Sequence, residues 1–229
     1  DGAHHQRLTR ECGATVRNRQ TIRPVVKHKL CTGCGTCAGV CPRAALEMVV
    51  RQGRYVPRLD KTRCIQCGLC FDACPGHRVD FDEMSAELFG DIPHELALGR
   101  YLGCYSGHAV DSQVRYDGAS GGLVSALVAF ALEEGLIDGA LVTRMRHDDP
   151  LRPEAWIART RSGILHAAGS KYCPVTIGTA LAQILNSEGR YAVVGLPCHI
   201  QGLRQAEQCI PRQGTDSLSH QSRVQPQLQ

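Results

Sequence analysis

Eight of the thirteen cysteines in this chain of 229 residues fall into two runs with the same spacing. The runs are Cys31-x2-Cys34-x2-Cys37-x3-Cys41-Pro42 and Cys64-x2-Cys67-x2-Cys70-x3-Cys74-Pro75, and the second repeats the first after 33 residues. Thiolates bind soft metal ions, whereas disulfides between such close neighbours would close strained rings. The two runs therefore predict metal centres.

The spacing within the runs indicates which metal they bind. Zinc ribbons separate two Cys-x2-Cys pairs by a longer spacer, but here four cysteines crowd into eleven residues, twice. The C-x2-C-x2-C-x3-C-P run binds 4Fe-4S clusters, and in two-cluster proteins its fourth cysteine ligates the other cluster. We therefore expect two 4Fe-4S clusters. The first cysteine set is Cys31, Cys34, Cys37 and Cys74, and the second cysteine set is Cys41, Cys64, Cys67 and Cys70.

Short elements around the runs predict a small ferredoxin-like fold. Gly33, Gly35 and Gly68 would let the loops curl so that backbone N–H groups point at the cluster sulfurs. Segments 45–50 and 55–57 predict two short strands that pair across a glycine-containing turn.

Beyond residue 118, apolar runs alternate with segments of helical length. This alternation predicts an α/β layer, preceded by a short helix. The expected helices are 85–98, 122–135 and 175–187, and the expected strands are 139–144, 155–160 and 191–195.

Composition and charge exclude several classes of protein. Hydrophobic residues make up 43% and charged residues 21%, as in ordinary globular proteins. No apolar stretch reaches the roughly 18 residues that cross a bilayer, and the polar N-terminus lacks the apolar core of a secretory signal. The net charge of +4 comes from scattered basic residues, which argues against a nucleic-acid partner. We expect a cytoplasmic protein with no membrane span. The Gln-rich segment 210–229 predicts a disordered tail.

Four motifs carry a resemblance to a known family. They are Cys104-Tyr-Ser-Gly-His, Gly118-Ala-Ser-Gly-Gly122, Gly169-Ser-Lys-Tyr172 and Val193-Val-Gly-Leu-Pro-Cys198. In order and spacing, the chain resembles the coenzyme F420 hydrogenase and dehydrogenase beta subunits over about residues 25–209. The family usually continues beyond the Pro-Cys motif into a domain that helps close the cofactor pocket, which implies a C-terminal truncation here. The expected fold class is α+β: a two-cluster bacterial ferredoxin-like domain over residues 21–84, then an α/β flavin-binding domain over residues 100–209.

The resemblance implies a function. Family members hold a flavin that passes electrons between iron-sulfur clusters and the deazaflavin coenzyme F420, and relatives reduce tetrapyrroles or formate-linked acceptors. We expect an oxidoreductase subunit in which FAD exchanges a hydride with F420 or another hydride carrier and single electrons leave through the clusters. Its expected partner is the large subunit of a hydrogenase, formate dehydrogenase or reductase. The alternatives are an electron-transfer module without its own substrate site and a structural remnant.

Two loops are candidates for binding the flavin. Gly118, Ala119, Ser120, Gly121 and Gly122 precede a predicted helix, whose free N–H groups and dipole suit a phosphate, although such a turn also serves as a simple N-cap. The second loop holds Ser170, Lys171 and Tyr172. These would supply a cation for a phosphate or for the reduced flavin, and an aromatic face for stacking, unless the lysine is solvated and the tyrosine only half-buried.

The second catalytic candidate beside Lys171 is Cys198. It stands between a predicted strand and a predicted helix, where the helix N-terminus would lower the pKa of its thiol. It would then serve as a ligand, a redox thiol or a cofactor contact; the alternative is a small buried hydrophobic residue. Its neighbour His199 is either a proton donor or a cap.

Overall fold

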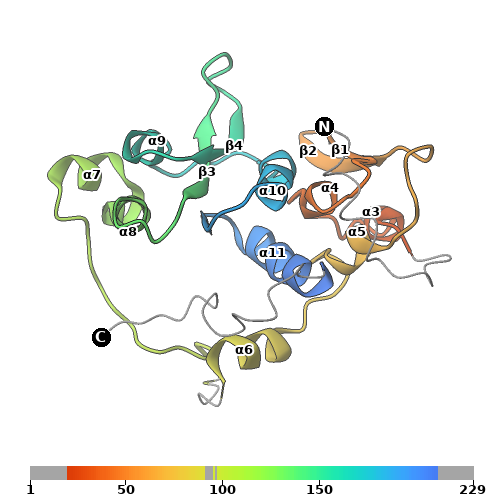
Figure 1. Cartoon of the computed structure of the whole chain (residues 1–229), viewed down its shortest axis with the longest axis horizontal. Coiled ribbons are helices and arrows are strands. Elements are labelled where there is room, and N and C mark those ends of the chain that lie inside the picture. Colours follow the sequence, from red (N-terminus) through yellow and green to blue (C-terminus); the bar gives the residue numbers. More distant parts are fainter. Residues whose placement is uncertain (1–19, 91–94, 96, 211–229) are drawn as a thin grey trace.

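The computed structural model describes residues 20–90, 95 and 97–210 (Figure 1). The tail predicted from sequence lies outside the described residues from position 211 onward. The helices are α3 (Arg23–Lys27), α4 (Thr36–Gly39), α5 (Leu69–Asp72), α6 (Phe81–Phe89), α7 (Ser112–Asp117), the 3₁₀ turn η1 (Ala119–Gly122), α8 (Leu123–Glu133), α9 (Arg161–His166), α10 (Gly178–Leu185) and α11 (Pro197–Cys209). The strands are β1 (Leu46–Arg51), β2 (Arg54–Leu59), β3 (Gly139–Met145), β4 (Pro153–Ala158) and β5 (Tyr191–Val193).

The N-terminal half of the described chain has a ferredoxin-like architecture. Strands β1 and β2 pair antiparallel across Gln52 and Gly53, which both have left-handed φ angles of 50° and 75°. Two left-handed residues suit the twist of a tight hairpin, so the predicted strand pair is confirmed. Helices α4 and α5 stand 33 residues apart, each directly after a left-handed glycine, Gly35 or Gly68. The cysteine repeat is therefore also a repeat in backbone conformation.

The rest of the described chain forms a mixed α/β layer. Its sheet has the order β4-β3-β5, with β4 antiparallel and β5 parallel to β3. Side chains of β3 alternate between two cores: Ala140 and Val142 pack with α8 and α9, whereas Leu141 packs with α10 and α11. All three predicted strands and the helices at 122–135 and 175–187 are confirmed, each within a few residues of its bounds.

One hydrophobic core joins the two halves. Residues Val40 and Leu69 beside the cysteine loops pack with Leu181 of α10 and Ala206 of α11. A backbone hydrogen bond of 2.9 Å also runs from Ile177 N to the carbonyl of Cys34. Helices α10 and α11 therefore lie between the sheet and the ferredoxin-like part (Figure 1). The predicted domain boundaries remain predictions.

The short helix predicted at 85–98 lies earlier in the structure. Helix α6 begins at Phe81, because the Asp80 side chain caps it by accepting a hydrogen bond of 3.0 Å from Glu83 N. It ends at Gly90, whose φ of 57° breaks the helix. Within the described part of the chain, no helix is long and apolar enough to cross a membrane.

Candidate functional site

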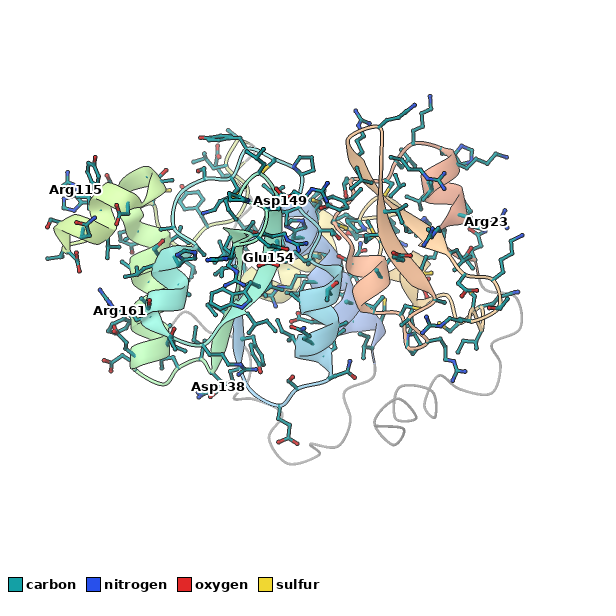
Figure 2. The ribbon with its side chains drawn as sticks, turned by 90° about the horizontal axis from the view of Figure 1, so that it is seen from above. Arg23, Arg115, Asp138, Asp149, Glu154 and Arg161 are labelled. Atoms are coloured by element: carbon teal, nitrogen blue, oxygen red, sulfur yellow. The ribbon has the colours of Figure 1, made fainter. Side chains whose placement is uncertain are left out.

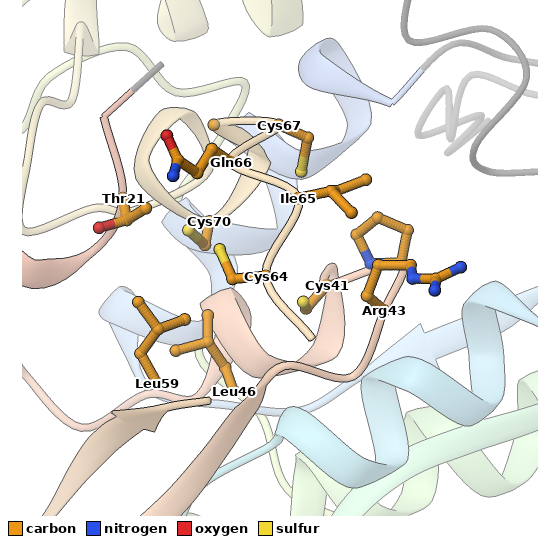
Figure 3. A pocket seen from close by; sticks show the side chains of 12 residues that line it. Thr21, Cys41, Arg43, Leu46, Leu59, Cys64, Ile65, Gln66, Cys67 and Cys70 are labelled. Atoms are coloured by element: carbon orange, nitrogen blue, oxygen red, sulfur yellow. The ribbon is translucent and has the colours of Figure 1, made fainter. Parts of the chain in front are cut away.

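The second cysteine set surrounds one cavity. Cys41 from the first run lines this cavity together with Cys64, Cys67 and Cys70 from the second run (Figure 3). Burial raises the pKa of the Cys70 thiol to about 12, the backbone N–H of Ile22 lowers it, and Cys67, Cys41 and Cys64 raise it further. The fourth cysteine of one run thus lies among the first three of the other, as the sequence predicts.

The cysteines of the first set also lie close to one another. Burial raises the pKa of the Cys37 thiol well above its ordinary value, and Cys34, Cys74, Cys70 and Cys31 raise it further, in that order. Burial raises the pKa of Cys74 to about 11, and its thiol neighbours are Cys34 and Cys31. The two sets therefore adjoin each other, and each crosses between the runs.

The arrangement of the thiols suits clusters better than single ions. Among the described residues, no group of three or more His, Cys, Asp or Glu side chains lies close enough together to hold one metal ion. Four sulfurs around a hollow can instead each bind a different iron of a cubane. Backbone and hydroxyl groups also reach the sulfurs: Ala45 N donates to Cys41 Sγ at 3.2 Å, and Thr36 Oγ1 lies 3.5 Å from Cys34 Sγ. The ligand assignment itself stays a prediction.

The predicted phosphate loop is a tight turn between α7 and α8. Ser120, Gly121 and Gly122 have successive φ angles of 51°, 73° and 69°, and Gly122 is the N-cap of α8. A Cβ on Gly122 would lie 2.3 Å from the Val114 carbonyl oxygen, and one on Gly118 would lie 2.4 Å from Gly122 Cα. These glycines are required by the turn itself, so their presence does not by itself indicate a ligand.

The lysine of the second predicted loop is engaged by its own backbone. Lys171 Nζ donates to the carbonyls of Ala167 and Gly169 at 2.7 and 3.0 Å, and also to Ala168. Burial lowers the pKa of Lys171. The ammonium thus satisfies carbonyls after α9 rather than facing an open site, and Tyr172 is 97% exposed. The two predicted loops do meet, because a Cβ on Gly169 would lie 3.6 Å from the Asp117 carbonyl oxygen.

The expected lowering of the Cys198 pKa is wrong. Cys198 occupies the first turn of α11, but burial raises the pKa of its thiol, and a hydrogen bond with Thr32 only partly opposes this. The nearby Cys34 thiol raises it further. Burial therefore dominates over the helix N-terminus at this position. The structure places Cys198 beside the first cysteine set rather than beside Lys171.

His199 acts as a cap. Its ring is 2% exposed, and its Nδ1 accepts a hydrogen bond of 3.1 Å from Leu196 N. Burial lowers the pKa of His199, and a backbone hydrogen bond at Val175 opposes this. The imidazole thus ties the end of β5 to the segment before α10, which leaves its ring nitrogens occupied by backbone groups.

A cleft of about 870 Å³ opens where the two halves meet. One wall comes from the first cysteine loop and the hairpin turn, and the other from the segment before α10 and the start of α11. The charged residues on it are Lys29, Arg51 and Arg54, and the others include Cys31, Tyr55, Pro174, Val175, Leu196 and Cys198. Sequence reasoning missed this site because its walls are far apart in the chain. Its only signals in the sequence were Cys31 and Cys198, which were predicted separately and line opposite walls of the cleft.

The cleft and the predicted phosphate loop lie on different sides of the sheet. Helices α7 and α8 stand at the end of the molecule away from the ferredoxin-like part (Figure 1). The segment 169–175 connects them, since Gly169 lies against the α7–α8 turn and Pro174 and Val175 line the cleft. The candidate residues therefore do not line one pocket. They lie along a path that runs from the α7–α8 turn through residues 169–175 to the cleft.

Comparison with known families identifies both halves. Residues 104–182 match the model described as coenzyme F420 hydrogenase/dehydrogenase, beta subunit N-term, and residues 30–77 match the 4Fe-4S dicluster domain. The chain therefore contains the N-terminal domain of the coenzyme F420 hydrogenase/dehydrogenase beta subunits next to a 4Fe-4S dicluster domain. It is related to the beta subunits of F420-dependent hydrogenases and reductases.

Individual relatives agree with this assignment. An uncharacterized protein of Methanocaldococcus jannaschii is 32% identical over 76% of this chain and 52% of its own length. The coenzyme F420-dependent sulfite reductase of the same organism is 30% identical over 81% of this chain and 26% of its own length. The coenzyme F420 hydrogenase subunit beta of Methanosarcina barkeri is 35% identical over 48% of this chain and 38% of its own length.

The chain spans about half the length, or less, of these curated relatives. Among solved structures, the F420-reducing [NiFe] hydrogenase complex from Methanosarcina barkeri is similar. The matched chain has 31% identity and a TM-score of 0.46, with coverage of 51% of this chain and 40% of that one.

Proposed function

We propose that this chain is a flavin-dependent iron-sulfur oxidoreductase subunit that exchanges electrons between coenzyme F420, through FAD, and two 4Fe-4S clusters. The observation that carries the proposal is the cleft between the halves, because Cys31 of the first cysteine set lies in one wall and Cys198 of the family's Pro-Cys motif in the other. A redox cofactor in this cleft would lie against a cluster ligand.

The residues of the cleft fit an anionic, planar cofactor. Lys29, Arg51 and Arg54 supply positive charge at its rim, and acidic side chains are absent from its described lining. Val56, Val175 and Leu196 supply apolar surface. FAD, when bound, converts between the two-electron chemistry of a deazaflavin and the one-electron chemistry of clusters. Arg51 and Arg54 would bind its phosphates, and the apolar side chains would exclude water from its ring.

The family resemblance supports a contribution from residues 118–122, and Ala119 and Ser120 of this turn are exposed. With Lys171 held by carbonyls, the path along residues 169–175 carries no free cation of its own. We therefore expect the arginines of the cleft to be more important for FAD binding than Lys171.

Replacing Arg54 tests this site. Arg54→Glu should weaken FAD binding about tenfold, roughly 1.4 kcal/mol, because it places a negative charge beside the cofactor's phosphates. The measurement is a fluorescence titration of the cluster-loaded protein with FAD. The control is Lys61→Glu, which reverses an exposed charge outside the cleft. Equal dissociation constants for the parent and Arg54→Glu would remove the cleft from the flavin site.

One observation favours the second candidate, an electron-transfer module without its own substrate site. The lysine expected to face the flavin instead bonds three backbone carbonyls. A stopped-flow record of FAD-loaded protein mixed with reduced F420, and separately with NADH, distinguishes the candidates. Flavin reduction by F420 is the expected result. Reduction by neither would favour the module, and reduction by NADH alone would place the protein outside F420 chemistry.

A buried hydroxyl should tune the first cluster. Thr36 is fully buried, and its hydroxyl lies 3.5 Å from Cys34 Sγ, so it can donate to the thiolate. Hydrogen bonds to cluster sulfurs help set the reduction potential, and they stabilise the more negative reduced state. The isosteric Thr36→Val should therefore shift the potential of the first cluster to a more negative value. Potentiometry followed by EPR measures this shift, and Thr32→Val, on the cleft side of the same loop, is the matched control.

A further inference from the structure

The ferredoxin-like part has a positive charge that the rest of the chain lacks. Residues 20–80 contain ten Lys and Arg against four Asp and Glu, whereas the other residues contain sixteen against eighteen. An oxidised 4Fe-4S cluster with its four thiolates carries a charge of about −2. Two clusters therefore reduce this excess without cancelling it, and the cations lie on the surface.

The two cysteine sets differ in what covers them. The first set has three buried cysteines, and its loop packs against α10 through the hydrogen bond from Ile177 N to the Cys34 carbonyl. In the second set only Cys70 is buried. The loop that carries Cys64 and Cys67 faces outward, and Ile65 between them is 48% exposed. The second cluster is therefore the one placed to meet a protein in solution.

The surface around the second set combines positive charge with one apolar side chain. We define the second-set surface by the exposed residues Arg43, Lys61, Arg63, Ile65 and Gln66. Arg43 and Ile65 both line the cavity of the second set and lie beside its cysteines in Figure 3.

The acidic residues nearby do not cancel this charge. Glu47 is paired with Arg58, and Asp60 accepts hydrogen bonds from the backbone and hydroxyl of Thr62. The pKa of Asp60 is lowered mainly by these hydrogen bonds from Thr62 and only to a smaller extent by the charge of Arg63. Arg43 and Lys61 have no ion-pair partner among the described residues, which leaves them available to an incoming protein.

We propose that the second-set surface docks a redox protein with an acidic surface, which exchanges one electron with the cluster of the second set. The proposal rests on the two clusters of the proposed function. The step moves a single electron from the reduced cluster to the partner's oxidised centre, or the reverse, and no bond or proton changes. Charge complementarity orients the encounter and raises its rate at low salt, while Ile65 provides the apolar contact close to the cluster.

The test uses two haem proteins of opposite charge as probes. The dithionite-reduced, cluster-loaded chain is mixed with acidic cytochrome b5 or with basic cytochrome c, and haem reduction is followed in a stopped flow at several ionic strengths. The rate constant for cytochrome b5 should fall at least tenfold between low and high salt, and that for cytochrome c should rise. The proposal would be overturned if the rate constants for the two cytochromes changed in the same direction with salt. A faster reaction with cytochrome c than with cytochrome b5 at low salt would also overturn it.

Charge reversal at the surface gives the second arm. Arg43→Glu/Arg63→Glu should slow the reaction with cytochrome b5 at least tenfold at low salt. Arg115→Glu is the control, because Arg115 lies at the opposite end of the molecule from Arg23 and the ferredoxin-like part (Figure 2). Unchanged rates in the double variant would contradict the proposal, as would displacement of cytochrome b5 by an equal concentration of mixed-sequence duplex DNA. Iron content is measured on every sample, so a failure of the clusters themselves is seen separately.

Discussion

Cys41→Ala should reduce the iron and acid-labile sulfide of the reconstituted protein from about eight of each per chain to about four. The physical reason is the crossover of the runs: Cys41 belongs to the first run but lies with Cys64, Cys67 and Cys70 around the cavity of the second set. Its loss should therefore remove the cluster of the second set and leave the first. Iron and sulfide assays on protein reconstituted without oxygen measure the change.

The complementary variant identifies which cluster is lost. Cys74→Ala should also leave about four irons, but those of the second set. Thr36→Val provides the marker, since it shifts the potential of the first cluster alone: the shift should persist in Cys41→Ala and vanish in Cys74→Ala. Cys104→Ala, at an exposed cysteine, should keep all eight irons. The opposite pattern of shifts would show that each run binds its own cluster, and tightly bound zinc would exclude clusters altogether.

The sequence predicts the parts of this fold that depend on neighbouring residues. The hairpin follows from alternating strands around Gln52 and Gly53, and the cysteine loops follow from glycines that accept left-handed angles. The strand order with β3 in the centre and the sharing of one core by both halves depend on contacts between distant segments. Short helices such as α9, capped by Thr160, lack the length for a periodic signal.

The candidate site shows the same limit. The spacing of a cysteine run indicates which metal centre it binds. The role of a single glycine or lysine depends instead on the residues around it in the fold. The Val114 carbonyl leaves no room for a side chain at Gly122, and three carbonyls after α9 accept hydrogen bonds from the Lys171 ammonium. The motifs do not reveal either contact. The cleft combines Arg54, Cys31 and Leu196, and no single motif contains all three residues. Local chemistry was therefore predictable, and the cofactor path was not.

Gly202→Val should destabilise the junction between the halves more than any change on the surface. A Cβ at Gly202 of α11 would lie 2.3 Å from Thr36 Oγ1 and 3.0 Å from Thr36 Cβ, and Thr36 is fully buried. Overpacking of this kind costs about 1 to 3 kcal/mol, and the gain in helix propensity over glycine offsets only part of it, about 0.5 kcal/mol. The expected result is a lower midpoint of urea-induced unfolding. Circular dichroism measures this transition.

A double-mutant cycle separates this contact from general damage to α11. Thr36→Ala removes Oγ1, the atom that the new side chain would strike most severely at 2.3 Å, and keeps only Cβ. Gly202→Val/Thr36→Ala should therefore recover part of the lost stability. Gly107→Ala is the control, because a Cβ there meets nothing closer than 3.9 Å. Strict additivity of the two changes would show that α11 does not pack on the cysteine loop. Because the cleft takes one wall from each half, Gly202→Val should also weaken FAD binding, and restored binding in the double variant would tie the cofactor site to this junction.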